Sequence, residues 1–433
     1  MHLKEFFEAK KIAVVGAARE REKVGNVIFR NLIENKILKV FPINPNTDYI
    51  EGVKTLPSVM AVPFPLDLVI IAVPSQIVPA ILQDCGEKGV KNIIIISAGF
   101  SEAGNVELTD TINDLIEKYN LNVLGPNVMG IINNYRDMNA SFFSGKMKKG
   151  GISFVSQSGA LGSAVLDKII ESNLGFANFI SMGNMMQIDF ISALEYLIQD
   201  RNTEVIMLYI ESLKDGTGRK FIDLCKKSSK KIIVLKAGKS ENGLKAAMTH
   251  TASLSSDAKI YSGEFKQAEI IEAESLEEMF VMANIFSKYK NFGKRGCVIT
   301  NAGGLGVLAV DSLSDVSLPD IPEKILKEFD SIIPKGYSRK NPLDILGEAS
   351  AERYLKVMKM LDKESWFDFF VVLASPQAMT NGKEIAKVLN QFKKPIFACF
   401  VGGKSFAEAR KIMTDENIIH FEDVSELKIL SRL

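Results

Sequence analysis

The sequence contains few cysteines, and their positions argue against two classes of protein. Four occur among 433 residues, at positions 85, 225, 297 and 399. Their wide spacing fits neither a zinc site nor a disulfide framework. Because each lies in or beside an apolar segment, we expect buried, reduced thiols and therefore a cytoplasmic protein.

Long apolar runs and an excess of one charge are also missing. No run reaches the roughly 18–20 residues that a membrane-spanning helix needs, and the charged N-terminal segment lacks the apolar core of a secretory signal. Lysine and arginine number 53 and aspartate and glutamate 52, a net charge of +1, so we expect neither a membrane nor a nucleic-acid partner. Hydrophobic residues make up 46%, and the length suggests about three domains of roughly 150 residues.

Apolar strands alternate with helical patterns in three blocks. Strands are predicted at residues 12–15, 66–72 and 92–96, at 152–155, 205–209 and 232–235, and at 297–300, 369–373 and 396–399, with helices such as 25–35 and 77–88 between them. Unbroken Val/Ile runs that alternate with helices are typical of parallel sheets covered on both faces. We therefore predict an α/β fold: a Rossmann-like domain (1–130) followed by two flavodoxin-like domains (147–290 and 293–433), with ordered links at 133–151 and 288–295.

An internal repeat opens the second and third blocks. Val-Ser-Gln-Ser-Gly-Ala-Leu-Gly at 155–162 is followed 144 residues later by Ile-Thr-Asn-Ala-Gly-Gly-Leu-Gly at 299–306. In each copy a strand runs into a turn of small residues and then a helix, whose first N–H groups and partial positive charge favour an anion. We predict phosphate binding by Ser156, Gln157, Ser158, Gly159 and Ala160, and by Asn301, Ala302, Gly303, Gly304 and Leu305. Close packing alone would explain the glycines, but not the hydroxyl or amide side chains kept before both helices.

The turn after the first strand, residues 16–25, is another candidate phosphate site. Its small residues would let the backbone approach a phosphate, and Arg19 and Lys23 add positive charge. The glycine spacing departs from G-x-G-x-x-G, and Asn44-Pro45-Asn46 stands where a ribose-binding acid is expected. A nicotinamide-dependent oxidoreductase is therefore disfavoured, whereas an ordinary tight turn stays open as an alternative.

One of the three histidines has surroundings suited to chemistry. His250 lies in a stretch of small and hydroxyl residues without helical or strand period, whereas His2 is terminal and His420 suits a packed or surface role. Histidine is a nucleophile at neutral pH when a carboxylate holds its other ring nitrogen. Glu211, just past the end of an apolar strand, is placed for that task. Taken alone, a structural histidine and a solvated glutamate stay open.

Taken in order, these motifs resemble the α subunit of ADP-forming acetyl-CoA synthetases, the NDP-forming acyl-CoA ligases related to succinyl-CoA synthetase. The resemblance covers the whole chain and rests on Ser-Gln-Ser-Gly at 156–159, Ile-Glu-Ser at 210–212, Thr-His-Thr-Ala-Ser-Leu at 249–254 and Asn-Ala-Gly-Gly at 301–304, with support at 125–127, 341–344 and 375–379. The chain departs from the family at Ala252, where glycine is usual, and at Asn46, where lysine is usual.

The resemblance implies a reaction and assigns its residues. Phosphate would convert an acyl-CoA into an acyl phosphate and free CoA, His250 would take the phosphoryl group, and ADP would receive it to give ATP. Glu211 would steady His250, and the two repeated turns would cradle the phosphohistidine. Coenzyme A is expected on the first domain, at Gly16, Ala17, Ala18, Arg19, Lys23, Val24, Gly25, Pro45, Val73, Pro74, Ser75, Ser97, Ala98, Gly99, Phe100 and Asn127.

The resemblance also implies a partner. The three blocks use up the chain and leave no ATP-grasp domain, so ADP/ATP and Mg²⁺ are expected on a separate β subunit, in an α2β2 assembly, with no metal site on this chain. One alternative stays open, a catalytically inactive CoA-binding regulator. The synthetase-like half of a protein acyltransferase is disfavoured, because it would need an attached acetyltransferase domain and the sequence contains no sign of one. The sequence does not define the acyl group.

Overall fold

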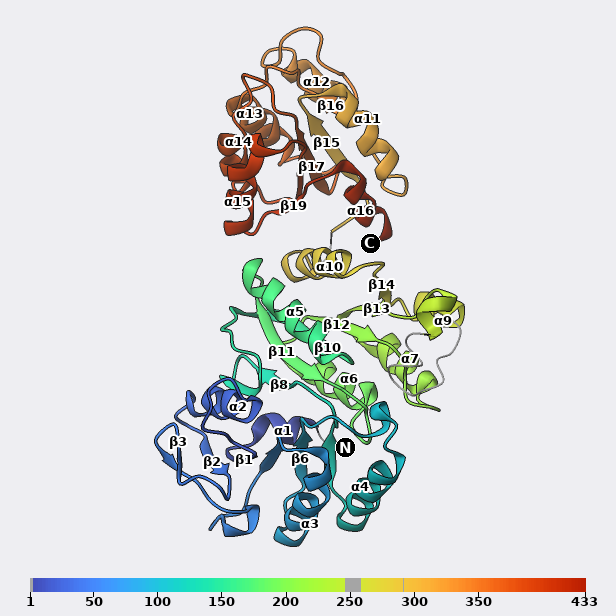
Figure 1. Ribbon diagram of the computed structural model, residues 1–433. Coiled ribbons are helices and arrows are strands. Elements are labelled where there is room, and N and C mark those ends of the chain that lie inside the picture. Colours follow the sequence, from blue (N-terminus) through green and yellow to red (C-terminus); the bar gives the residue numbers. More distant parts are fainter. Residues whose placement is uncertain (1–2, 246–257, 291) are drawn as a thin grey trace. The chain divides into compact units, whose positions relative to one another are not determined.

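The computed structural model describes residues 3–245, 258–290 and 292–433. The chain forms two compact units, Met1–Met279 and Phe280–Leu433, and each is described by itself. Figure 1 shows helices flanking the sheets within each unit. The sheets are built from the apolar runs of the sequence, which are buried on both faces.

The first sheet has five parallel strands in the order β2-β1-β5-β6-β7. Its elements are β1 (Lys11–Val15), β2 (Lys39–Ile43), β5 (Leu68–Ile71), β6 (Asn92–Ile95) and β7 (Asn122–Leu124), with α2 (Val24–Ile33), α3 (Val78–Lys88), α4 (Val106–Tyr119) and a small hairpin of β3 (Tyr49–Ile50) and β4 (Val53–Lys54). The strands and helices predicted for the first block are confirmed. The strand order reverses between β1 and β5, which is where an open α/β sheet binds ligands.

The second sheet repeats this arrangement and extends it. Its order is β14-β13-β12-β10-β11-β8-β9. Its strands are β8 (Gly130–Asn133), β9 (Met138–Ser141), β10 (Lys149–Ser156), β11 (Phe176–Ser181), β12 (Val205–Ile210), β13 (Lys231–Lys236) and β14 (Ile271–Glu272), and its helices are α5 (Gly159–Glu171), α6 (Phe190–Gln199), α7 (Gly218–Lys227) and α9 (Ala258–Gln267). The segment 133–151, expected to be a link, contains β9, which together with β8 forms an antiparallel extension of the sheet.

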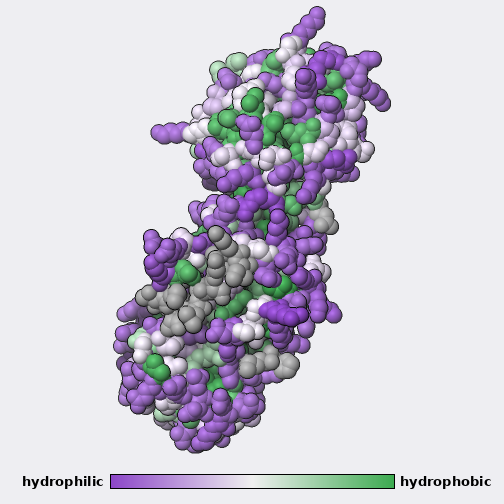
Figure 2. Space-filling model, turned by 90° about the vertical axis from the view of Figure 1, so that its right-hand side faces the viewer, coloured by the Kyte–Doolittle hydropathy of each residue, from purple (hydrophilic) through white to green (hydrophobic). Residues whose placement is uncertain are grey.

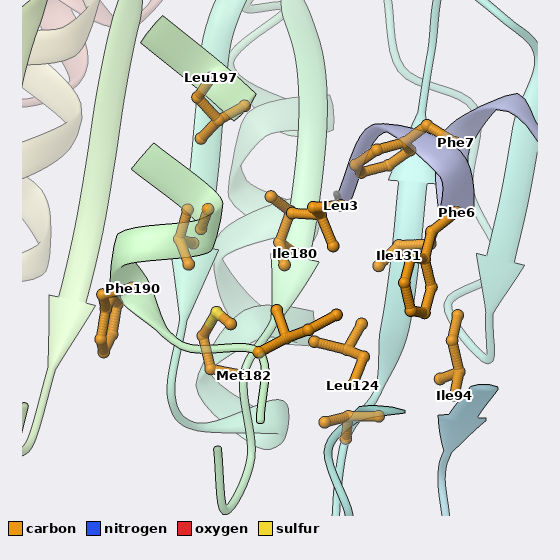
Figure 3. Packing of buried hydrophobic residues seen from close by; sticks show 14 of the residues in the cluster. Leu3, Phe6, Phe7, Ile94, Leu124, Ile131, Ile180, Met182, Phe190 and Leu197 are labelled. Atoms are coloured by element: carbon orange, nitrogen blue, oxygen red, sulfur yellow. The ribbon is translucent and has the colours of Figure 1, made fainter. Parts of the chain in front are cut away.

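The N-terminal helix α1 (Leu3–Glu8) and the extension join the first two sheets into one unit. Figure 3 shows Phe6 of α1 close to Ile131 of β8 and Ile94 of β6. Phe7 stacks on Tyr196 of α6, with ring centroids 4.7 Å apart. One apolar core therefore continues from the first sheet into the second.

The second unit contains one sheet, in the order β16-β15-β17-β18-β19, with every described pair parallel. Its strands are β15 (Gly296–Thr300), β16 (Leu343–Asp344), β17 (Phe369–Ala374), β18 (Ile396–Phe400) and β19 (Ile419–Phe421). Its helices are α11 (Gly303–Ser312), α12 (Glu323–Phe329), α13 (Ala351–Leu361), α14 (Gly382–Leu389), α15 (Ala407–Asp415) and α16 (Lys428–Arg432), while α10 (Leu276–Lys288) spans the division between the units. Numbered along the chain, the parallel strands of all three sheets share the order 2-1-3-4-5.

The surface, the cysteines and His420 are placed as the sequence predicted. Hydrophilic side chains cover most of the face shown in Figure 2. All four cysteines are buried free thiols, as predicted. His420 lies on β19 with its Nδ1 3.0 Å from the Ile418 carbonyl oxygen, and burial lowers its pKa, which confirms a packed role. Across the described ranges, no helix is both long and apolar enough to cross a membrane.

Candidate active site

The turn after β1 is shaped by two glycines that have no room for a side chain. Gly16 has φ +87°, and a Cβ there would lie 2.2 Å from the Ala72 carbonyl oxygen. A Cβ on Gly25 would lie 2.0 Å from the Gly16 carbonyl oxygen. The first turn of α2 therefore packs directly against this loop. Because α2 has no side-chain cap, its first N–H groups are open to an anion.

The loop after β2 is tied to the same turn. Asn44 donates from Nδ2 to the Ala17 carbonyl oxygen at 2.7 Å, and Arg19 donates from Nη2 to Thr47 Oγ1 at 2.9 Å. Pro45 lies between these two contacts along the chain, and Asn26 donates to the Ala18 carbonyl oxygen at 2.8 Å. Polar side chains thus hold the loop that carries the predicted coenzyme A residues of the first turn.

The loops after β5 and β6 complete this edge of the sheet. Ser97 donates from Oγ to the Val73 carbonyl oxygen at 2.5 Å, and its own carbonyl accepts from the Asn127 N–H at 2.9 Å. A Cβ on Gly99 would lie 2.9 Å from Ser75 Oγ. The predicted residues Val73, Pro74, Ser75, Ser97, Ala98, Gly99, Phe100 and Asn127 therefore lie in connected loops, and a Cβ on Gly16 would lie 2.8 Å from Val73 Cγ1, which joins them to the first turn.

Two residues at this edge were missed by the sequence patterns. Glu102 accepts through Oε1 from the Gly99 N–H at 2.6 Å, and Asn184 donates from Nδ2 to Glu102 Oε2 at 2.5 Å. Burial alone would raise the pKa of Glu102, but hydrogen bonds from Gly99 and Asn184 bring the pKa below its usual value. Asn184 follows β11, so this contact connects the site edges of the first two sheets. The one local sequence signal for Asn184 is the Gly183-Asn184 pair shortly after β11.

The first repeated turn lies where the strand order reverses in the second sheet, between β10 and β12. Ser156 donates from Oγ to the Ser158 carbonyl oxygen at 2.6 Å, and Ser158 caps α5 by accepting from the Leu161 N–H at 3.3 Å. Gln157 is buried and reaches across to the end of β12. Its Oε1 accepts from the N–H groups of Glu211 and Ser212 at 2.9 and 3.0 Å.

The second repeated turn reproduces this geometry in the other unit. Thr300 donates from Oγ1 to the Ala302 carbonyl oxygen at 3.0 Å, the counterpart of the Ser156 contact. Asn301 accepts from the Ser375 N–H at 2.8 Å, just past the end of β17, and donates to the Ser375 carbonyl oxygen at 3.0 Å. The hydroxyl and amide side chains that the repeat keeps therefore shape both turns and hold the neighbouring loop. Gly303 and Gly304 are exposed at the start of α11.

Glu211 is buried at the carboxyl edge of the second sheet, with 6% of its surface exposed. Its N–H is held by Gln157, and its carbonyl oxygen accepts from Lys236 Nζ at 2.8 Å. Burial, together with the Glu211 carboxylate, raises the pKa of Tyr209 to about 12. A glutamate in this setting is a fixed acceptor rather than a solvated loop residue.

Two parts of the predicted centre are not described. His250 lies in the segment 246–257, outside the described residues. The two repeated turns belong to different units, so their meeting at one phosphoryl group stays a prediction. Among the described residues, no group of three His, Cys, Asp or Glu side chains is arranged to hold a metal ion.

Comparisons with known proteins give the class first. A CoA binding domain matches residues 10–134, and a succinyl-CoA ligase-like flavodoxin domain matches residues 149–286. Together with the three sheets and the glycine-rich turns at their edges, these matches define an acyl-CoA ligase of the succinyl-CoA ligase type.

Individual relatives narrow the class to a family. The chain is 38% identical to the α subunit of acetate–CoA ligase (ADP-forming) II of Pyrococcus furiosus, over 96% of this chain and 94% of that protein. It is 40% identical to an ADP-forming acetate–CoA ligase of Methanocaldococcus jannaschii, of which it spans 63%. A solved structure of Ca. Korarchaeum cryptofilum acetyl-coenzyme A synthetase 1, in complex with phosphate and ADP, matches with TM-score 0.93 and 35% identity, covering 99% of this chain and 95% of that one. The chain belongs to the α subunits of ADP-forming acetate–CoA ligases.

Proposed function

We propose that this α subunit carries the phosphoryl group on His250 during the interconversion of an acyl-CoA, ADP and phosphate with an acid, ATP and CoA. The single observation that carries the proposal is the repeated turn geometry, in which Gln157 and Glu211 are locked together beside the start of α5. A buried carboxylate next to a helix N-terminus suits an imidazole that must accept and release a phosphoryl group.

The reaction balances in three steps. A phosphate oxygen attacks the thioester carbonyl carbon, and the CoA thiolate leaves to give an acyl phosphate. A ring nitrogen of His250 then attacks phosphorus, and the carboxylate leaves as the P–O bond to it breaks. Finally, a terminal oxygen of ADP takes the phosphoryl group from the histidine to give ATP, and the free imidazole is restored. The Glu211 carboxylate would accept a hydrogen bond from the other ring N–H of His250 and so fix the tautomer of the imidazole.

We assign coenzyme A to the edge of the first sheet and phosphate to the two repeated turns. The coenzyme loops are the connected turns after β1, β2, β5 and β6, where Gly16 and Gly25 let the backbone segments pack closely against one another. The phosphohistidine would carry about two negative charges. Two helix ends, each contributing about 0.3–2 kcal/mol, would hold such a dianion without preventing its transfer.

The partner we propose is an ATP-grasp β subunit that binds ADP or ATP with Mg²⁺, in an α2β2 assembly in the cytoplasm. The P. furiosus relative is named as an α subunit, and the longer M. jannaschii relative extends beyond the matched part. Magnesium there would screen the charge of the transferring phosphate. The acyl group is proposed to be acetate because the P. furiosus and M. jannaschii relatives are named for it.

Phosphorylation of the chain tests the proposal. The chain is mixed with a candidate β subunit, Mg²⁺ and γ-labelled ATP, and acid-labile, base-stable label is expected on the α subunit. His250→Ala should abolish the label, whereas His420→Ala, a matched control on β19, should keep it. An inactive CoA-binding regulator would bind CoA yet acquire no label. Label that persists in His250→Ala would contradict the phosphocarrier assignment.

A further inference from the structure

Lys236, the last residue of β13, is a buried lysine that the mechanism above does not use. Only 2% of its surface is exposed. Its Nζ donates to the carbonyl oxygens of Glu211, at 2.8 Å, and of Ala237, and the Tyr261 ring centroid lies 4.9 Å away. The ammonium group is thus enclosed at the site edge of the second sheet.

The contact falls where regular strand pairing ends. The ladder between β12 and β13 closes at Ile210 and Lys236, and the Ala237 N–H donates to the Ile210 carbonyl at 2.9 Å. Glu211 comes next and has left the ladder, so its N–H and carbonyl oxygen bond to Gln157 and Lys236 instead. Side chains from the strands on both sides of β12 therefore fix the peptide groups that flank the Glu211 Cα, and with them the direction of its side chain.

The second repeat shows that this extra lysine is not required by the turn itself. There, the Asn301 side chain holds both the N–H and the carbonyl oxygen of Ser375, and that carbonyl also accepts from the Gln377 N–H at 3.0 Å. In the first repeat the Gln157 amide accepts from two N–H groups and donates to Ser212 Oγ at 3.2 Å, but it does not reach the Glu211 carbonyl oxygen, which accepts from Lys236. The additional lysine contact thus occurs in the first repeat, which is the one that contains the buried Glu211.

The charge balance supports a specific role. Burial lowers the pKa of Lys236 to about 8, while the carboxylates of Glu211 and Glu272 favour its charged form. An ammonium kept out of water at this edge is unfavourable unless it is paired. Tyr209, Tyr261 and Lys239 are further titratable groups near Glu211 or Lys236, and Lys239 opposes the charged form of Lys236.

We infer that Lys236 is a positioning residue for phosphoryl transfer: it holds the Glu211 carbonyl so that the glutamate side chain keeps the orientation needed to steady the phosphorylated histidine. The inference rests on the proposed function and adds a residue to it. Lys236 acts through Glu211 and touches no substrate in this scheme.

The test compares phosphorylation rates in variants of the α subunit assembled with the β subunit. Lys236→Met should lower the initial rate of α-subunit labelling by roughly 10- to 100-fold, with the CoA dissociation constant unchanged because CoA is assigned to the first sheet. Lys236→Arg, which retains charge and donors, should recover part of the rate. Lys230→Met is the matched control, since Lys230 also binds carbonyl oxygens, those of Leu197 and Asp200, and precedes the opposite end of β13.

A double-mutant cycle separates positioning from general structural support. If Lys236 acts through Glu211, Lys236→Met should cause no further loss in a Glu211→Gln background. An equal loss in both backgrounds, or a wild-type rate in Lys236→Met, would overturn the inference. Should the methionine variant not fold, Lys236→Gln replaces it in the same cycle. Failure of the proposed function is recognised separately, because label would then persist in His250→Ala or be missing from the wild-type chain.

Discussion

Replacing Gln157 by leucine tests whether the amide clamp is what builds the first phosphate turn. Leucine has a similar size but no acceptor, so the N–H groups of Glu211 and Ser212, both buried, lose their partner. Each unsatisfied buried donor costs about 1–3 kcal/mol. Partial relaxation towards water reduces the sum, and we expect a loss of about 3 kcal/mol in the free energy of unfolding of the first unit.

The chain offers its own reporters for this measurement. Trp366 is the only tryptophan and lies in the second unit, so its fluorescence during urea unfolding follows that unit, whereas far-ultraviolet circular dichroism follows both. Gln157→Leu should shift the dichroism transition and leave the Trp366 transition in place. Asn301→Leu, the matched change in the other repeat, should shift the Trp366 transition because it removes the hydrogen bonds to Ser375.

A conservative variant separates the fold from the chemistry. Gln157→Glu keeps the acceptor oxygens, so the free energy of unfolding should change by less than about 1 kcal/mol, while the added negative charge beside the phosphate turn should slow α-subunit labelling. The reasoning is refuted if Gln157→Leu loses under about 1 kcal/mol, or if it moves the Trp366 transition as much as the dichroism transition.

Three further predictions concern the coenzyme loop, the buried lysine and the thiols. Gly25→Ala should weaken CoA binding at least about tenfold by isothermal titration, because the new Cβ would lie 2.0 Å from the Gly16 carbonyl oxygen and force the turn open. Gly218→Ala is the control, since a Cβ there would meet no atom within 4 Å, and equal affinities of the two variants would contradict the assignment. Burial lowers the pKa of Lys236 from 10.5 to about 8, so between these pH values the folded state binds fewer protons than the unfolded chain. This residue therefore makes the free energy of unfolding rise with pH across that window, by at most about 3 kcal/mol. Urea unfolding of Lys236→Met should lack this rise, and parallel pH profiles of the variant and the wild type would disprove it. Burial raises the pKa of Cys85, Cys225 and Cys399 to about 12 and also raises the pKa of Cys297. A thiol reagent should therefore label all four cysteines only after denaturation, and rapid labelling of the native chain would be the contrary result.

The sequence was sufficient for the features that depend on neighbouring residues. Apolar runs of Val and Ile predicted the strands, because such runs are buried on both faces of a parallel sheet. The repeat predicted two equivalent turns, and the structure shows equivalent hydroxyl-to-carbonyl contacts from Ser156 and Thr300. The gathering of the turns after β1, β5 and β6 at one sheet edge was predictable because the glycines and the strand ends that precede them are local signals, while the binding of coenzyme A there stays a prediction.

Contacts between distant segments could not be derived in this way. Gln157 and Glu211 are 54 residues apart, and no local pattern indicates that one amide holds both neighbouring N–H groups. From the sequence, Lys236 is only the polar residue at the end of an apolar strand. The register between β12 and β13 is what places it beside the Glu211 carbonyl. The segment 133–151 lacks a clear period, yet β9 forms there because β8 offers it an edge with unpaired backbone groups.

The shared core of the first unit has a practical consequence for dissecting this chain. A truncated fragment that ended near residue 130 would keep the whole CoA-binding sheet but discard the antiparallel extension and α6. Phe7 would lose the ring of Tyr196, Asn31 would lose its acceptors at Ser141 and Phe143, and the apolar face of α1 would be bared to solvent. Such a piece should aggregate, so the smallest portion suited to isolated expression extends through both sheets.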